Sequence, residues 1–219
     1  SLAHGTHTYE HLQEFIDTGI PIVFFDKVPA IDQVSKVVVD DFQGAYQVVQ
    51  HLISQGCQHI AHFRGPLLAS TSRARFEGYK QALQDHQLPY DESLVYACEE
   101  ITMEEGQAFA QDLLAKGKPC DGIFCITDSV AMGAMTSLKA HGIQIPAQVA
   151  VAGFSNWKMA TIIEPPLTSV AQPGLEMGRI ATRLLLREIQ AKRNATVASP
   201  ETIVLETSLI IRASSSRGV

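Results

Sequence analysis

The 219-residue sequence predicts an α/β protein in which helices cover both faces of a parallel sheet. Short runs rich in Val, Ile and Phe alternate with longer segments whose apolar residues recur at helical spacing. Glycine ends several of these segments, as at Gly19 and Gly56. Strands that alternate with helices of this length form crossover units, and such units build parallel sheets.

The alternation begins near the start of the chain. Residues 8–18 are expected to form a helix, because their apolar side chains fall on one face. Gly19 ends this helix before a strand over residues 20–25. An irregular link then leads to a short β-rich run at residues 36–39.

The strand-and-helix unit then repeats along the chain. A helix is expected from Asp40-Asp41 to about Gln55, because it has one apolar face and Gly56 follows it. Further units are expected at strand 59–63 with helix 72–86, strand 94–97 with helix 103–116, strand 122–126 with helix 128–141, and strand 149–153 with a short irregular helix near Trp157.

The last third of the chain departs from this pattern. Pro165-Pro166 interrupts it, and residues 168–171 are predicted to form a short strand. Residues 174–191 are predicted to form the longest amphipathic helix. A strand over residues 202–211 closes the core, and Ala213–Val219 is expected to be a disordered tail.

The composition is ordinary for a soluble globular protein, with 46% hydrophobic and 18% charged residues. The net charge of −6 argues against a direct grip on nucleic acid, because phosphate binding requires a basic face. No stretch approaches the ~18 consecutive apolar residues of a membrane span. The four cysteines lack the spacing of a zinc site, so we expect small buried hydrophobes in a reducing compartment.

The sequence contains no catalytic or cofactor motif. It lacks a nucleophile elbow, a P-loop, a dinucleotide fingerprint and a carboxylate pair with a supporting base. His4, His7 and His11 resemble a metal site, but residues 4–7 precede the predicted helix, so a solvated chain end is expected. We therefore expect no enzyme, no cofactor and no bound metal.

The main candidate for ligand binding is Arg75. An apolar run stops at Gly65-Pro66, a polar loop with residues 70–72 follows, and a helix that carries Arg75 begins. In open α/β sheets ligands bind at the carboxyl ends of the strands, where this loop would lie. Arg75 can present a planar fork of donors to hydroxyls or a carboxylate. The alternative is a solvated arginine on a surface helix.

Seven short motifs follow one another over nearly the whole chain. They are Gly19–Asp26, Val38–Gly44, Gly65-Pro66 with Thr71, Arg75 and Gly78, Thr127-Asp128 with Ala131 and Gly133, Val149–Phe154, Pro165–Thr168 with Gln172-Pro173, and Leu209–Arg212. This order resembles the effector-binding core of the lactose/galactose-repressor (LacI/GalR) family of bacterial transcription regulators. The resemblance implies a two-lobed, periplasmic-binding-protein-like fold of type I with an incomplete N-terminal lobe.

The resemblance also implies where the lobes lie in the sequence. The N-terminal lobe would comprise residues 1–39 and 173–206, and the C-terminal lobe residues 40–172 and 207–219. Hinge strands would cross between the lobes at Val39–Asp41, Val170–Pro173 and Glu206–Ser208. In the family, two strand–helix units and a DNA-binding headpiece precede the point where this chain begins, so we expect a truncated chain without the headpiece.

Further ligand-binding residues follow from the same resemblance. Asp26 ends a strand expected to be buried and would accept hydrogen bonds from sugar hydroxyls. Gln172 would lie on a crossing strand next to the ligand. Thr71 would either reach the ligand or cap the nearby helix. Ile101 would either form an aliphatic wall of the site or belong to the ordinary core.

The strand ends at residues 126 and 154 supply the remaining candidates. Thr127 would face the ligand, whereas Asp128 is expected to be the N-cap of its helix. Where the family has an aspartate that binds paired hydroxyls, this chain has Ser155-Asn156, which could bond a hydroxyl without the charge. Ala69 stands where purine-responsive members carry a second arginine.

The function implied by the resemblance is ligand sensing in a cytoplasmic DNA-binding regulator. A small polar effector, a sugar or a derivative, would bind between the lobes of a homodimer and alter its affinity for operator DNA through the missing headpieces. Met132, Met135 and Ile163 are the candidate dimer interface, although they could equally be core. A solute-binding receptor of a sugar transport system is one alternative. A flavodoxin-like enzyme is another, but the chain lacks a nucleophile–base pair.

Overall fold

The computed structural model describes residues 1, 10–29, 31–196 and 198–218. The chain forms two compact units, each assembled from separate segments. Unit 1 comprises Ser1–Asp40, Leu68–Thr71 and Pro173–Glu206, and unit 2 comprises Asp41–Leu67, Ser72–Gln172 and Thr207–Val219. The assignment of these units to an N-terminal and a C-terminal lobe stays a prediction.

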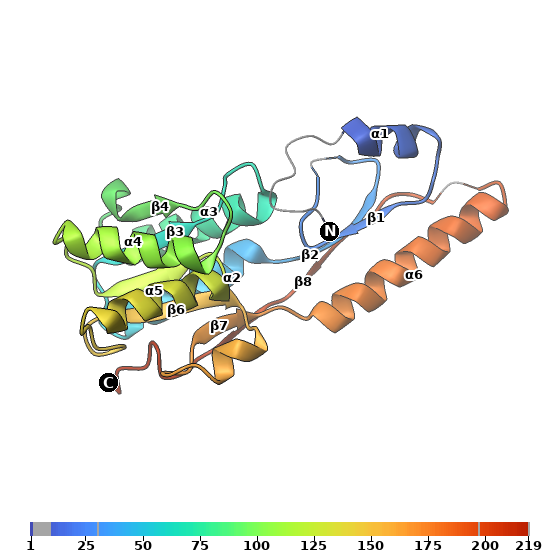
Figure 1. Ribbon diagram of the computed structural model, residues 1–219. Helices are drawn as coiled ribbons and strands as arrows, with labels where there is room; N and C mark the ends of the chain where they lie inside the picture. Colours follow the sequence, from blue (N-terminus) through green and yellow to red (C-terminus); the bar gives the residue numbers. More distant parts are fainter. Residues whose placement is uncertain (2–9, 30, 197, 219) are drawn as a thin grey trace. The chain divides into compact units, whose positions relative to one another are not determined.

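Unit 1 contains a parallel sheet with the strand order β1-β2-β8 (Figure 1). Its elements are α1 (Glu10–Asp17), β1 (Val23–Phe25), β2 (Ser35–Val39), α6 (Gly174–Arg193) and β8 (Thr202–Leu205). Val37 and Val39 of β2 share a buried cluster with Met177, Ala181 and Leu184 of α6. The apolar face of the predicted amphipathic helix is thus the face that covers this sheet.

Unit 2 contains a larger sheet with the strand order β4-β3-β5-β6-β7-β9. Its strands are β3 (Ile60–Arg64), β4 (Val95–Ala97), β5 (Gly122–Cys125), β6 (Ala150–Ser155), β7 (Thr168–Ala171) and β9 (Ser208–Ile210). All neighbouring strands are parallel except β7 and β9, which are antiparallel. The carboxyl ends of β3, β5, β6 and β7 therefore meet at one edge of the sheet.

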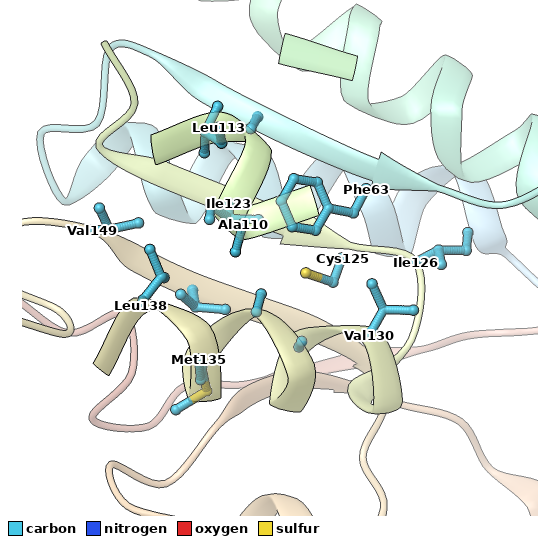
Figure 2. Packing of buried hydrophobic residues seen from close by; sticks show 14 of the residues in the cluster. Phe63, Ala110, Leu113, Ile123, Cys125, Ile126, Val130, Met135, Leu138 and Val149 are labelled. Atoms are coloured by element: carbon cyan, nitrogen blue, oxygen red, sulfur yellow. The ribbon is translucent and has the colours of Figure 1, made fainter. Parts of the chain in front are cut away.

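Helices cover both faces of this sheet, as the alternation of strands and helices predicts. On one face Phe63 and Ile123 pack with α4 (Met103–Ala115) and α5 (Asp128–Ala140), as Figure 2 shows. On the other face Ile60 and Phe124 pack with α2 (Asp41–Ser54) and α3 (Ser70–Asp85). Short 3₁₀ helices η1 (Glu92–Leu94) and η2 (Lys158–Thr161) complete the unit. The predicted α/β architecture is confirmed.

Helices α4 and α5 approach each other closely through two glycines. A Cβ atom on Gly106 would lie 2.1 Å from the carbonyl oxygen of Val130, and a Cβ atom on Gly133 would lie 1.9 Å from that of Met103. Both contacts are with backbone atoms, which cannot move aside as a flexible side chain can. Glycine at these two positions lets the helix backbones touch.

Two expectations about the end of the chain are wrong. The strand predicted over residues 202–211 is two strands, because β8 pairs with β2 in one sheet and β9 pairs with β7 in the other. The predicted disordered tail at Ala213–Val219 is ordered through residue 218: Ser214 and Ser215 are fully buried. Their hydroxyls find partners across the unit, which short-range sequence patterns do not reveal.

Hydrogen bonds hold this last segment to the rest of unit 2. Ser214 Oγ donates to the carbonyl oxygen of Val151 at 2.6 Å, and Ser215 Oγ lies 2.6 Å from Thr168 Oγ1. Arg217 donates from Nη2 to the carbonyl oxygen of Asp121 at 2.6 Å. The same arginine donates from Nε to the carbonyl oxygen of Pro146 at 2.9 Å.

Within the described residues, no helix has the length and apolar character needed to cross a bilayer.

Candidate functional site

Arg75 lies in the second turn of α3 and is almost fully buried, with 5% of its surface exposed. Its Nε donates to Asp41 Oδ1 at 2.8 Å, and its Nη2 lies 2.7 Å from the same oxygen. Its Nη1 donates to the carbonyl oxygen of Ile126 at 2.7 Å. The guanidinium also lies over the ring of Phe154, 3.5 Å from its centroid. The alternative of a solvated surface arginine is wrong.

These contacts fix the orientation of the guanidinium at the carboxyl ends of the strands. Ile126 follows β5, and Phe154 is the penultimate residue of β6. A guanidinium has five N–H donors, and three of them are engaged by Asp41 and Ile126. The other two N–H groups make no hydrogen bond to the described residues. A ligand role for Arg75 stays a prediction.

The residues at the end of β6 adopt an unusual backbone conformation. Ser155 has a φ of 114° and Asn156 a φ of 52°, both in a region that L-residues rarely adopt. Such conformations cost on the order of 1–3 kcal/mol each and persist only where the surroundings enforce them. The backbone N–H of Asn156 donates to Ser169 Oγ at 2.9 Å, and Arg212 Nη2 donates to Asn156 Oδ1 at 2.6 Å. These two contacts fix the turn.

Asp128 is not the N-cap of α5, contrary to the prediction. Thr127 is the cap, and its Oγ1 accepts from the backbone N–H of Val130 at 3.4 Å. Asp128 is instead fully buried, where it accepts from Ser169 Oγ at 2.5 Å and from the backbone N–H of Trp157 at 2.7 Å. Burial raises the pKa of Asp128, and the hydrogen bonds from Ser169 and Trp157 oppose this rise.

The side-chain oxygen of Thr127, which was predicted to face a ligand, therefore caps helix α5. Thr71 is the second residue of α3, which begins at Ser70, and so it is not the N-cap of that helix. Ile101 is buried in the core beside α4, with a φ of 62°. Its backbone N–H donates to Glu105 Oε2 at 2.7 Å, which holds a β-branched residue in this strained conformation. Ligand roles for Thr127, Thr71 and Ile101 stay predictions.

Asp26 belongs to unit 1 and directly follows β1. The strand is less buried than expected, because only Phe24 of its three residues is buried and Phe25 is exposed. Asp26 has a φ of 62°, and its backbone N–H donates to the carbonyl oxygen of Val37 at 3.0 Å. Gln172 is the residue after β7 and is partly buried. The ligand roles of both residues stay predictions.

Sequence reasoning missed four residues that build the site in unit 2. They are Asp41, Phe154, Ser169 and Arg212. An aspartate that opens a helix is typical of a cap, and nothing near Ser169 or Arg212 in the sequence indicates their partners. Only the fold brings these residues to the ends of β5 and β6.

The predicted dimer residues line a hollow of about 550 Å³ in unit 2. Met132 and Met135 are themselves buried, and Met135 belongs to the core cluster, whereas Trp157 and Met159 on the rim are about half exposed. The hollow is lined by Met103, Ser129, Met132, Met135, Thr136, Lys139, Trp157, Met159, Ile163 and Glu164. An interface role for this surface stays a prediction.

The structure identifies no metal site in the part of the chain it describes. No group of three or more His, Cys, Asp or Glu side chains there could hold a metal ion. His4 and His7 of the histidine cluster lie outside the described residues, as does the side chain of His11.

The sequence of the chain is similar to those of bacterial transcription regulators. A model of the periplasmic binding protein-like domain matches residues 49–215. The HTH-type transcriptional repressor PurR of Actinobacillus pleuropneumoniae serotype 3 is 31% identical over 208 residues, covering 95% of this chain and 61% of that protein. The HTH-type transcriptional regulator CelR of Thermobifida fusca is 34% identical over 211 residues, with the same coverage. The chain thus spans 61% of the length of these relatives.

The fold of the chain is similar to solved structures of transcriptional regulators. A transcriptional regulator CelR–cellobiose complex has a TM-score of 0.85 and 34% identity, covering 93% of this chain and 61% of that chain. A LacI family transcriptional regulator from Enterococcus faecium with bound ribose also has a TM-score of 0.85, at 27% identity, covering 98% of this chain and 77% of that chain.

Proposed function

Because the chain belongs to the periplasmic binding protein-like domain family, as the effector-binding core of a LacI-family regulator, we propose that it senses a ligand for transcription control. The observation that carries this proposal is Arg75, held rigidly at the carboxyl ends of the strands with two N–H groups to spare. Two similar structures hold cellobiose and ribose, which supports a sugar or a sugar derivative as the effector of this chain.

The ligand would act by stabilising one conformation of the regulator over another. It can shift that equilibrium only by its differential affinity for the two forms. The shift would change the affinity of a homodimer for operator DNA in the cytoplasm. DNA contact would come from a headpiece outside this chain, since the chain itself carries a net charge of −6. Met132, Met135 and Ile163 would contribute to the dimer interface.

A transport receptor with the same architecture is the other candidate. The relatives described above are named as transcription regulators, which favours the regulator. A direct test separates the two functions: once a ligand is found, its effect on operator binding by the full-length protein is measured. A ligand that binds but leaves operator affinity unchanged would contradict the regulatory role.

The ligand itself is sought by a thermal-shift screen of the full-length protein against sugars, sugar phosphates and purines. A ligand at 100 times its Kd adds about 2.7 kcal/mol of stability, which is easily detected.

Arg75→Lys keeps a cation beside Asp41 but loses the planar fork, so we expect at least a tenfold loss of affinity. Arg179→Lys on the exposed face of α6 is the matched control. Unchanged affinity in Arg75→Lys would refute the assignment of Arg75.

A further inference from the structure

The side chain of Asn156 has a fixed orientation. Arg212 Nη2 donates to Asn156 Oδ1 at 2.6 Å, and because a guanidinium has only donors, the amide oxygen must face it. Arg212 is itself held in place: its Nη1 donates to the carbonyl oxygen of Leu167 at 2.5 Å, and its backbone N–H donates to Thr168 Oγ1 at 2.8 Å. The amide NH₂ of Asn156 therefore points away from Arg212, and it has no partner among the described residues.

Arg75 presents further donors at the same end of β6. It lies over Phe154, two residues before Asn156, and two of its N–H groups are without a partner in the described part of the chain. The charges of Arg75 and Arg212 both act on Asp128, where they oppose the rise in its pKa. Both cations therefore favour the ionised form of this buried carboxylate.

The carboxylates near these donors already have protein partners. Asp41 faces Arg75, and Asp128 is fully buried with both oxygens accepting hydrogen bonds. A neutral sugar needs acceptors for its hydroxyl hydrogens as well as donors for its oxygens. The free groups of Arg75 and Asn156 are donors, and these suit a ligand group that only accepts.

We propose that Arg75 and Asn156 form a subsite for an anionic group, so that the effector is a sugar bearing a carboxylate or a phosphate. This inference rests on the proposed ligand-sensing function and narrows its ligand class. An anionic oxygen takes several charge-assisted hydrogen bonds at once, which neutral hydroxyls cannot match. Arg75 supplies the positive charge, the Asn156 amide supplies directed N–H groups, and Arg212 keeps that amide turned toward the ligand.

The test compares matched ligands on the full-length protein by isothermal titration. The probes are glucose, glucuronate and glucose 6-phosphate, with the corresponding galactose and ribose series and inorganic phosphate. An anionic member should bind at least tenfold more tightly than its neutral parent. Preference for a sugar acid identifies the carboxylate, and preference for a sugar phosphate identifies the phosphate. Binding of neutral members only, or of no anionic member, overturns the inference.

A charge substitution at Asn156 sharpens the test. Asn156→Asp keeps an oxygen for Arg212 and tolerates the positive φ, but it places a negative charge at the subsite. We expect the anionic ligand to bind at least tenfold more weakly and the neutral parent more tightly. Asn194→Asp, after α6 in unit 1, adds the same charge elsewhere and should change neither affinity.

Equal anion affinity in wild type and Asn156→Asp would overturn the subsite. An anionic ligand that binds as expected but does not alter operator binding would contradict the proposed regulatory function and leave the subsite standing. The two failures are therefore distinguishable.

Discussion

Ser169 and Asp128 form a fully buried hydrogen-bonded pair, with 2.5 Å between Ser169 Oγ and Asp128 Oδ1. The same hydroxyl accepts the backbone N–H of Asn156, and the second oxygen of Asp128 accepts that of Trp157. One pair of side chains from β7 and α5 thus holds the strained turn that follows β6. The turn carries Ser155 and Asn156, so this pair positions the candidate ligand residues.

Ser169→Ala removes both hydroxyl contacts and should loosen this turn. We expect the free energy of unfolding to fall by about 1–3 kcal/mol, because the buried Asp128 carboxylate loses a donor. Trp157 is the only tryptophan of the chain and is about half exposed, so its fluorescence anisotropy reports the turn directly. The anisotropy should fall in the variant.

Ser137→Ala is the matched control for that change. Ser137 Oγ is buried in α5 and has no hydrogen-bond partner among the described residues, so its loss should be neutral or slightly stabilising. Equal effects of the two serine substitutions on stability and anisotropy would contradict the role of Ser169.

His62 should make stability depend on pH. It is fully buried between the rings of Phe124 and Tyr79, and burial lowers its pKa to about 3. Between pH 6.5 and 3 the unfolded state therefore binds a proton that the folded state does not. The stabilising contribution is complete above pH 6.5 and is lost as pH falls, by roughly 5 kcal/mol in total.

His62→Phe isolates this contribution from that of the carboxylates. Phenylalanine keeps the aromatic stack and does not titrate, although the hydrogen bond between Nδ1 and the carbonyl oxygen of Phe124 is lost. The unfolding free energy of wild type minus that of the variant, measured by urea denaturation, should become less positive or more negative from pH 7 to pH 4. A difference that is constant with pH would refute the prediction.

Gly133→Ala should destabilise unit 2 by several kcal/mol. The added methyl group would lie 1.9 Å from the carbonyl oxygen of Met103, so α4 and α5 must move apart and their shared core must open. Gly178→Ala in α6 is the control, because a Cβ atom there meets nothing within 4 Å. That change should stabilise the protein by roughly 0.5–1 kcal/mol, as alanine is the better helix former. Thermal unfolding distinguishes the two, and similar melting temperatures would contradict the close approach.

Arg217→Ala should cost about 1–3 kcal/mol, because the carbonyl oxygens of Asp121 and Pro146 lose a charged donor. The control is Arg183→Ala on the exposed face of α6, where a change within about 0.5 kcal/mol is expected. Urea denaturation measures both. A null effect of Arg217→Ala would mean that the last segment contributes little to the fold.

Most elements could be predicted from the sequence, because hydrophobic periodicity and glycine stops are local signals. The helix predicted at residues 128–141 and the strand at 168–171 are examples, and their structural counterparts α5 and β7 differ by a residue at most. The division of residues 202–211 between two sheets depends on which strands lie nearby, and no local pattern encodes that. The burial of Ser214 likewise depends on Val151, more than sixty residues earlier.

The candidate site was predictable only in part. Arg75 is identifiable from its place after a strand and a polar loop, and the structure holds it at the carboxyl ends of the strands. Its partner Asp41 resembles a helix cap in sequence, and Asp128 resembles one so closely that its buried role was missed. A carboxylate at a helix start can bond its own backbone or a distant serine, and only the fold decides between them.

Residues 207–217 of unit 2 are translated after the last segment of unit 1, and this order has a consequence for biosynthesis. These residues leave the ribosome after the earlier segments of unit 2. They nevertheless belong to its interior, because β9 pairs with β7 and Ser214 Oγ donates to the carbonyl oxygen of Val151. Nascent unit 2 therefore carries an unpaired edge on strand β7 while the intervening part of unit 1 is being translated, and such an edge can pair with another chain. A premature stop codon near position 213 should consequently yield a polypeptide that proteases clear, even though Arg75 and its neighbours are all encoded.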